Sequence, residues 1–166
     1  MRPMTAAFQT RLTRLLGIQH PTVLPGMTYV AVPRLVGAVS AAGGLGILAS
    51  GALSPDECRR DIEQIRAITD RPFGVGFSLA LPGAIDCVDV ALLARVPVLN
   101  ISMGKGDWVI ERAHAYGGKV IATVSNEKHA RSAIDSGVDG LIVTGHEAAA
   151  HGGHVTSMVL IPAVRD

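Results

Sequence analysis

Short apolar runs recur along the chain at a steady interval, and a stretch with helical periodicity fills each gap between them. Strands that alternate with helices in this way indicate a parallel sheet with right-handed crossover connections. We expect the strands near Pro21–Leu24, Leu45–Ala49, Phe73–Leu79, Pro97–Ile101, Lys119–Val124 and Gly140–Thr144.

The helix between the second and third runs has the clearest boundaries. Ser54 suits the N-cap, Pro55 the first helical position, and Glu57 completes a capping box. Isoleucines then recur from Ile62 to Ile68 and predict one apolar stripe. Further helices are expected at residues 10–17, 33–40 and 126–136, and from Thr156 onward.

Six such units suit either a doubly wound sheet or most of a (β/α)8 barrel. A doubly wound sheet usually carries a phosphate loop after its first strand, and neither G-x-G-x-x-G nor G-x-x-x-x-G-K-[ST] occurs here. We therefore expect an α/β fold of the TIM-barrel type with about six of the eight units present, since a full barrel needs about 250 residues. This domain would span residues 10–166, after a leader at residues 1–9, and we expect the chain to be truncated at its C-terminus.

Composition narrows the classes of function. Apolar residues make up 48% of the chain and aromatic residues only 4%, which suits strands covered on both faces. A net charge of +1 and the lack of a binding motif argue against nucleic acid, and no apolar run is long enough to span a membrane. The two cysteines have no metal-site or disulfide spacing, so we expect a reducing compartment, the cytoplasm. Arginines without acids near the N-terminus resemble a transit peptide, but a short capped helix explains them better.

The richest chemistry lies between Thr144 and His154, in the stretch T-G-H-E-A-A-A-H-G-G-H. It follows an apolar strand, and α/β proteins build active sites at the carboxyl ends of such strands. His151 is the candidate general base, because an imidazole with a pKa near 6.5 accepts protons at neutral pH; a surface-loop histidine is the alternative. His146, Glu147, His151 and His154 are also zinc-competent types, but their spacing is not that of a helical pair, and we expect no metal. Glu147 is the candidate to orient the loop by accepting backbone N–H bonds, and a solvated glutamate is the alternative. His154 is interpreted as a loop or capping residue, and His146 receives no role.

The same stretch resembles the Q-G-x-E-A-G-G-H-x-G signature of the flavin-dependent nitronate monooxygenases, formerly called 2-nitropropane dioxygenases. Residues 21–27 and 40–46 resemble the family's P-x-I-Q-x-P/G-M and S-x-A-G-G-L-G motifs. The resemblance extends over about residues 10 to 164. It implies FMN as cofactor, a nitronate or nitroalkane and O2 as substrates, and His151 as the base above the flavin.

The resemblance also implies that Pro25, Gly26 and Met27 contact the flavin at the end of the first strand. Glycine there lets a flat ring approach the backbone, and methionine offers it a soft surface. A turn followed by a core methionine is the alternative. The family's glutamine on this strand is replaced by Leu24.

Three further departures affect the implied flavin contacts. Gly76 stands where the family commonly has a flavin-touching asparagine, and it offers only backbone. Thr144 replaces the motif glutamine and could still bond a flavin edge with shorter reach. Ala149 and Ala150 replace the two glycines before the histidine, and Ala149 adds a methyl group where close approach is needed.

Two other glycine-bearing segments have weaker signals. Gly43–Gly46 is interpreted as structural, capping a helix and allowing a tight turn into the second strand. Gly104-Lys105-Gly106, after the fourth strand, could approach a substrate anion, and a flexible loop is the alternative. Trp108 just beyond is expected to anchor its helix by packing.

Two alternatives to a nitronate monooxygenase remain. One is an FMN-dependent enoyl-ACP reductase, which shares both motifs and would be reduced by NAD(P)H. The other is an inactive fragment unable to hold FMN, since the family's phosphate-gripping loops belong to the last two units. The strands near Val23 and Ile142 would then be open edges, and we expect a homo-oligomer or a partner that completes the barrel.

Overall fold

The computed structural model describes residues 9–148 and 152–165 and contains one curled sheet of six parallel strands. The strands are β1 (Val23–Leu24), β2 (Leu45–Ala49), β3 (Gly74–Ser78), β4 (Val98–Ser102), β5 (Lys119–Val124) and β6 (Gly140–Val143). The helices are α1 (Arg11–Leu16), α2 (Pro33–Ala41), α3 (Pro55–Ile68), α4 (Ala84–Leu93), α5 (Asp107–His114), α6 (Glu127–Asp135) and α7 (Ser157–Arg165).

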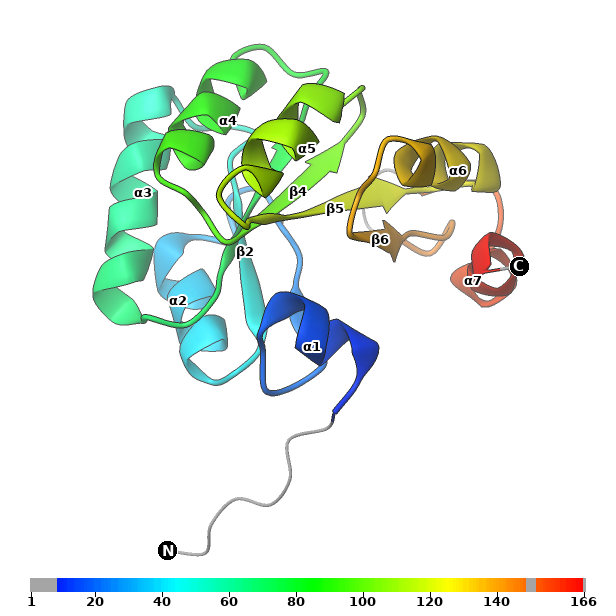
Figure 1. Cartoon of the computed structure of the whole chain (residues 1–166), viewed down its shortest axis with the longest axis horizontal. Helices are drawn as coiled ribbons and strands as arrows, with labels where there is room; N and C mark the ends of the chain where they lie inside the picture. Colours follow the sequence, from blue (N-terminus) through cyan, green and yellow to red (C-terminus); the bar gives the residue numbers. More distant parts are fainter. Residues whose placement is uncertain (1–8, 149–151, 166) are drawn as a thin grey trace, which may run out of the picture.

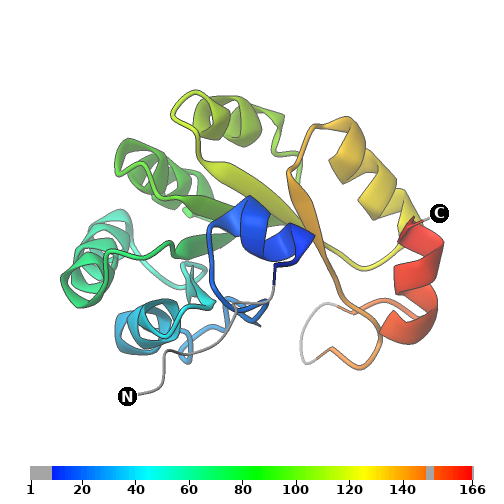
Figure 2. The ribbon, with the colours of Figure 1, turned by 60° about the horizontal axis from the view of Figure 1, so that its bottom comes forward.

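The strands pair in chain order, from β1 to β6, so every crossover advances the sheet by one strand in the same direction. The connecting helices lie on the outer side of the strands, and α1 lies across the concave side (Figures 1 and 2). This is a half-barrel of the TIM type, which confirms the fold expected from the strand–helix alternation and the lack of a phosphate-loop motif. β1 and β6 each have one strand neighbour among the described residues, and they are the two edges expected from the sequence.

Two apolar cores occupy opposite faces of the sheet, because side chains alternate along each strand. The outer core lies between the strands and helices α2 to α6 and includes Leu48, Val75, Leu99, Ile101 and Val120. The smaller inner core lies on the concave face, where α1 contributes Leu16 and the strands contribute Leu45, Ile47, Val98 and Ile121. The amino-terminal helix therefore closes the bottom of the barrel.

The element boundaries agree closely with the sequence expectations. β2 and β5 begin and end where expected, and the expected helix at 126–136 is α6, whose first turn Asn126 caps by accepting from the His129 N–H at 2.8 Å. The capping box of α3 is present, with Glu57 N–H to Ser54 Oγ at 3.3 Å and Ser54 N–H to Glu57 Oε2 at 2.8 Å. α1 ends at Gly17, whose φ of 66° is the left-handed cap expected of glycine.

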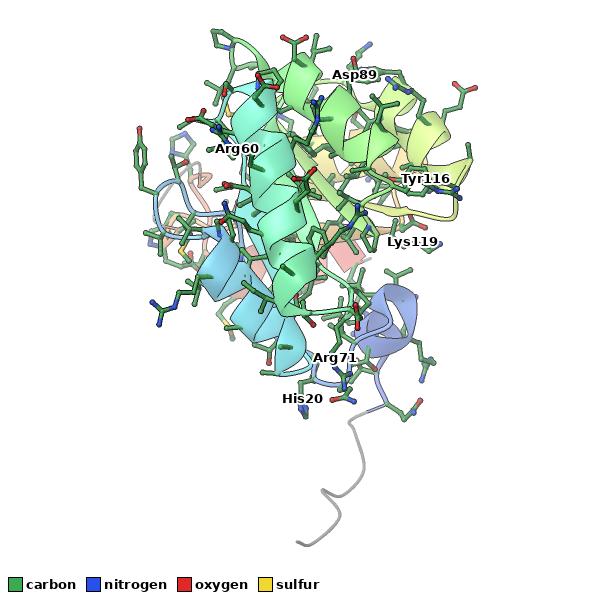
Figure 3. All side chains as sticks on the ribbon, turned by 90° about the vertical axis from the view of Figure 1, so that its left-hand side faces the viewer. His20, Arg60, Arg71, Asp89, Tyr116 and Lys119 are labelled. Atoms are coloured by element: carbon green, nitrogen blue, oxygen red, sulfur yellow. The ribbon has the colours of Figure 1, made fainter. Side chains whose placement is uncertain are left out.

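Polar groups at the amino-terminal end of the strands fasten β5 to the turn before β6. The Asp139 carboxylate accepts bonds from Lys119 Nζ at 3.0 Å and the Val120 N–H at 2.8 Å, and it lies 2.9 Å from His114 Nε2. Burial alone would raise the pKa of Asp139, but these hydrogen bonds outweigh it and lower the pKa. Figure 3 labels Lys119 beside Tyr116, above α1. Because this is the amino-terminal face of a barrel, we assign the cluster to stability.

The two cysteines are free and buried where α3 meets α4. Burial is the main cause that raises the pKa of the Cys58 thiol, to about 12, and it also raises the pKa of Cys87. Thiols this reluctant to ionise are poor nucleophiles. Neither cysteine is therefore a candidate nucleophile.

No helix in the described ranges is long and apolar enough to cross a membrane.

The segment Gly43–Gly46 is structural, as its sequence suggests. Gly43 has a φ of 93° at the end of α2, a conformation that favours glycine. A Cβ on Gly46 would lie 2.8 Å from the Val36 Cα and closer still to the Val36 carbonyl oxygen. Helix α2 therefore packs directly on the backbone of β2.

Gly46→Ala is expected to lower the free energy of unfolding by about 1–3 kcal/mol, because the new methyl group meets helix backbone that cannot move aside. Gly51→Ala is the matched control, since its Cβ would meet only the flexible end of Leu81 at 3.4 Å. Urea denaturation of both variants measures the difference. Equal stabilities would show that α2 can shift away from β2.

Candidate functional site

The concave face of the half-barrel changes from apolar to polar toward the carboxyl ends of the strands. Its lower layers belong to the inner core, with Ile47, Val98 and Ile121. Higher up, the same inward positions carry hydroxyl and amide groups. We call this set the polar floor; it consists of Ser78, Asn100, Ser102, Thr123 and Thr144.

Asn100 is the best-defined member of the polar floor and is only 9% exposed. Its Nδ2 donates to the Ile121 carbonyl at 3.2 Å and lies 3.0 Å from Thr123 Oγ1, and its Oδ1 lies 3.3 Å from the same hydroxyl. Both ends of the amide are thereby held by β5. The side chain therefore presents a fixed hydrogen-bonding group below the mouth of the barrel.

Two of the expected flavin contacts converge on one side chain. A Cβ on Gly26 would lie 3.7 Å from Ile47 Cγ2, and a Cβ on Gly76 would lie 3.3 Å from the same atom and 3.6 Å from Asn100 Oδ1. Gly76 and Asn100 are also register partners in the β3–β4 ladder. We call Gly26, Ile47 and Gly76 the glycine shelf, a surface without side-chain bulk above Ile47 and next to the Asn100 amide.

The residues around the shelf are positioned by short local contacts. Ser50 Oγ donates to the Gly76 carbonyl at 2.7 Å and fixes the backbone at the end of β2 against β3. Pro25, Gly26 and Met27 follow β1 directly and are exposed, with Met27 at 39%. The alternative of a core methionine is therefore wrong, because Met27 lies at the open end of the barrel.

The loop after β6 is anchored on both sides of residues 149–151. On the amino-terminal side, the Thr144 N–H donates to the Val124 carbonyl at 2.9 Å and the His146 N–H to the Val155 carbonyl at 2.9 Å. On the carboxyl-terminal side, Gly152 packs against the Gly145 carbonyl and Gly153 against the Ser125 carbonyl so closely that neither has room for a Cβ.

His151 and Ala149 lie outside the described residues, and their assignments stay predictions.

Glu147 performs the orienting role expected of it. Its Oε1 accepts the Ser157 N–H at 2.9 Å and also the Ser157 hydroxyl, at the start of α7. The hydroxyl bond is the largest of the causes that lower the pKa of Glu147 to about 2. His146 Nδ1 lies 3.6 Å from the same carboxylate, and within residues 9–148 and 152–165 no three metal-binding side chains gather.

Sequence reasoning missed Asn100 and Thr123. The signal is present, because Asn100 interrupts the apolar run of β4 at a position that alternates with Leu99 and Ile101 in the outer core. Thr123 lies on β5 at the position that alternates with Ala122 and Val124. A polar residue at an inward position near the carboxyl end of a strand is therefore the pattern that could have found both.

A half-barrel with small and polar inward residues at the carboxyl ends of its strands defines the class of β/α-barrel proteins that bind ligands at this face. The sequence profile described as nitronate monooxygenase matches residues 9–91. The chain belongs to the nitronate monooxygenase family.

Particular relatives extend the match over nearly the whole chain. The chain is 40% identical over 158 residues to the (3aS,4S,5R,7aS)-5-hydroxy-7a-methyl-1-oxo-octahydro-1H-indene-4-carboxyl-CoA dehydrogenase of Mycobacterium tuberculosis, covering 95% of this chain and 44% of that protein. FabK from Thermotoga maritima is 42% identical with a TM-score of 0.90, covering 94% of this chain and 50% of that one. Nitroalkane oxidase from Streptomyces ansochromogenes is 27% identical with a TM-score of 0.83, covering 93% and 57%. The chain thus spans about half the length of the relatives it matches.

The contact between Glu147 and Ser157 predicts an acid-sensitive loop. A lowered folded-state pKa means that the contact is fully present above the ordinary pKa of 4.5 and is lost as the pH falls toward 2. Hydrogen exchange at the Ser157 amide should therefore become less protected between pH 4.5 and 2, and Glu147→Gln should remove most of this pH dependence.

Glu111→Gln is the control, because the Glu111 carboxylate on α5 has no hydrogen-bond partner among the residues described. The Ser157 amide should keep its pH dependence in that variant. Identical exchange in the Glu147→Gln and Glu111→Gln proteins would show that Glu147 does not hold the loop.

Proposed function

We propose that this chain forms the ring-binding half of an FMN-dependent oxidoreductase. The observation that carries the proposal is the glycine shelf beside the fixed amide of Asn100, at the end of the barrel where such enzymes bind ligands. Family membership supports FMN as the cofactor.

The residues present suit a flat, hydrogen-bonding ring. Gly26 and Gly76 carry no side chain, and the buried Ile47 lies beneath both of them. Both Asn100 N–H donors bond to β5, so the amide would offer the ring the remaining acceptor capacity of its Oδ1. This amide comes from β4, one strand beyond the position where the family carries its asparagine, and it replaces what Gly76 lacks. Thr144 and Met27 complete the border from β6 and β1.

The proposed reaction is oxidation of a nitronate or nitroalkane with O2. Bound FMN would supply the two-electron acceptor and, once reduced, the reaction with O2. His151 would take the proton from the carbon next to the nitro group, and Glu147 would hold the end of the loop that carries it through the bond to Ser157. We place this activity in the cytoplasm, and Ala149 would border the flavin in the same loop.

Dehydrogenation of a CoA thioester is the second candidate reaction. It is favoured by the 40% identity, over 95% of this chain, to a dehydrogenase whose name describes a methyl-substituted octahydroindene carboxyl-CoA. Oxidation of a neutral nitroalkane and dehydrogenation of a thioester would use the same base and acceptor, because each removes a proton from carbon and passes two electrons to the flavin. Turnover with a panel of nitronates and acyl-CoA thioesters under O2 separates the two.

Gly76→Ala tests the cofactor site. Its Cβ would project onto the shelf at ordinary distances from Asn100 and slightly tight distances from Ile47, so the fold should tolerate it while the ring loses its contact surface. We expect FMN affinity, measured by quenching of flavin fluorescence, to fall about tenfold or more, equivalent to about 1.4 kcal/mol. Gly51→Ala should leave affinity unchanged, and equal affinities in the two variants would place the flavin elsewhere.

His151→Asn tests the base. In the flavin-loaded protein, turnover of a neutral nitroalkane should fall by about 10² to 10⁴, the usual range for loss of a general base. A preformed nitronate needs no deprotonation and should lose much less. Steady-state oxygen consumption measures both rates, and losses of the same size would assign His151 to binding or structure.

A further inference from the structure

A groove of about 650 Å³ opens beside the barrel mouth, between the loop that follows β4 and the outer face of α6. Its basic residues are Lys105, from the Gly104–Gly106 loop, and Lys128 and Arg131 from α6. None of these three has an ion-pair partner in the described ranges. Two aspartates, Asp107 and Asp135, also line it, which leaves the groove with an excess of positive charge.

The position of the groove suits an anion whose other end enters the barrel. α5 and α6 both begin at the carboxyl end of the sheet, so Lys105 and Lys128 lie at the same end as the polar floor. Asp135 is the last residue of α6 and lies at the far end of the groove. At the mouth end Lys105 and Lys128 outnumber Asp107, the first residue of α5, so the net charge there is positive.

The rim of the mouth is apolar and conformationally strained. Tyr29, in the loop after β1, is 87% exposed with a φ of 64°, and Met103, directly after β4, is 45% exposed with a φ of 55°. Residues other than glycine rarely adopt this left-handed conformation, and such strain clusters at ligand-binding loops. Met103 is separated from Lys105 by a single glycine, so an apolar surface leads directly into the cationic groove.

We propose that this groove binds the phosphates of a coenzyme A thioester whose acyl group passes Met103 into the barrel. The inference rests on the second candidate reaction above. Coenzyme A joins an apolar acyl end to a nucleotide with a pyrophosphate and a 3′-phosphate, and this order of polarity matches the sequence from rim to groove. The three basic side chains of the groove supply the charge-assisted hydrogen bonds that these phosphates accept.

The test is calorimetric titration of the full chain with coenzyme A itself. The double variant K128Q/R131Q should bind it at least about tenfold more weakly, with a shallower dependence on salt. The matched control R59Q/R60Q removes the same charge from α3, where Arg60 lies on the outer face far from α6 (Figures 1 and 3), and should bind as the original chain does. K105Q, in a loop, provides a second weakened variant whose folding does not depend on a helix.

Two further titrations make the outcome decisive. 4′-Phosphopantetheine, which carries one phosphate, should bind much more weakly than coenzyme A; equal binding would assign the groove to a carrier-protein prosthetic group and overturn the proposal. FMN affinity should be unchanged in K128Q/R131Q, so loss of flavin binding and loss of coenzyme A binding are distinguished. No binding of coenzyme A to the original chain, or equal binding to both double variants, would also overturn it.

Discussion

The period of two along each parallel strand decides which residues meet the helices and which line the inside of the barrel. Leu99 and Ile101 face the helices in the outer core, while Val98, Asn100 and Ser102 take the inward positions between them. Because the sheet curls, inward positions from different strands approach one another. Val98 at the bottom packs with α1, and Asn100 above it bonds to Thr123. The site thus exists because hydroxyl and amide side chains occupy the inward positions near the carboxyl ends of these strands.

Sequence patterns could predict most of the fold because its signals are local. The capping box at Ser54, the glycine that ends α1 and the apolar run of β5 are each specified by a few neighbouring residues. The convergence of Gly26 and Gly76 on Ile47 could not be predicted in this way, because it depends on register between three strands. Asn100 was missed for a related reason, since its partner Thr123 is on another strand and only the pairing of β4 with β5 brings them together.

The loop after β6 shows how a glycine-rich sequence is held in place. Gly145, Gly152 and Gly153 have no room for a side chain, so glycine here serves close packing of backbone on backbone. Glu147 adds a charge-assisted bond to the first residue of α7.

The central claim is that a flavin ring lies on the glycine shelf against the Asn100 amide. The most direct measurement is the NMR signal of the Asn100 side-chain NH2 group during addition of FMN, with the exposed Asn126 side chain as an internal reference. The account predicts a saturable shift of the Asn100 signal at the same FMN concentrations that change the flavin absorbance, while Asn126 stays unchanged. Saturable FMN binding that leaves the Asn100 signal in place would contradict it.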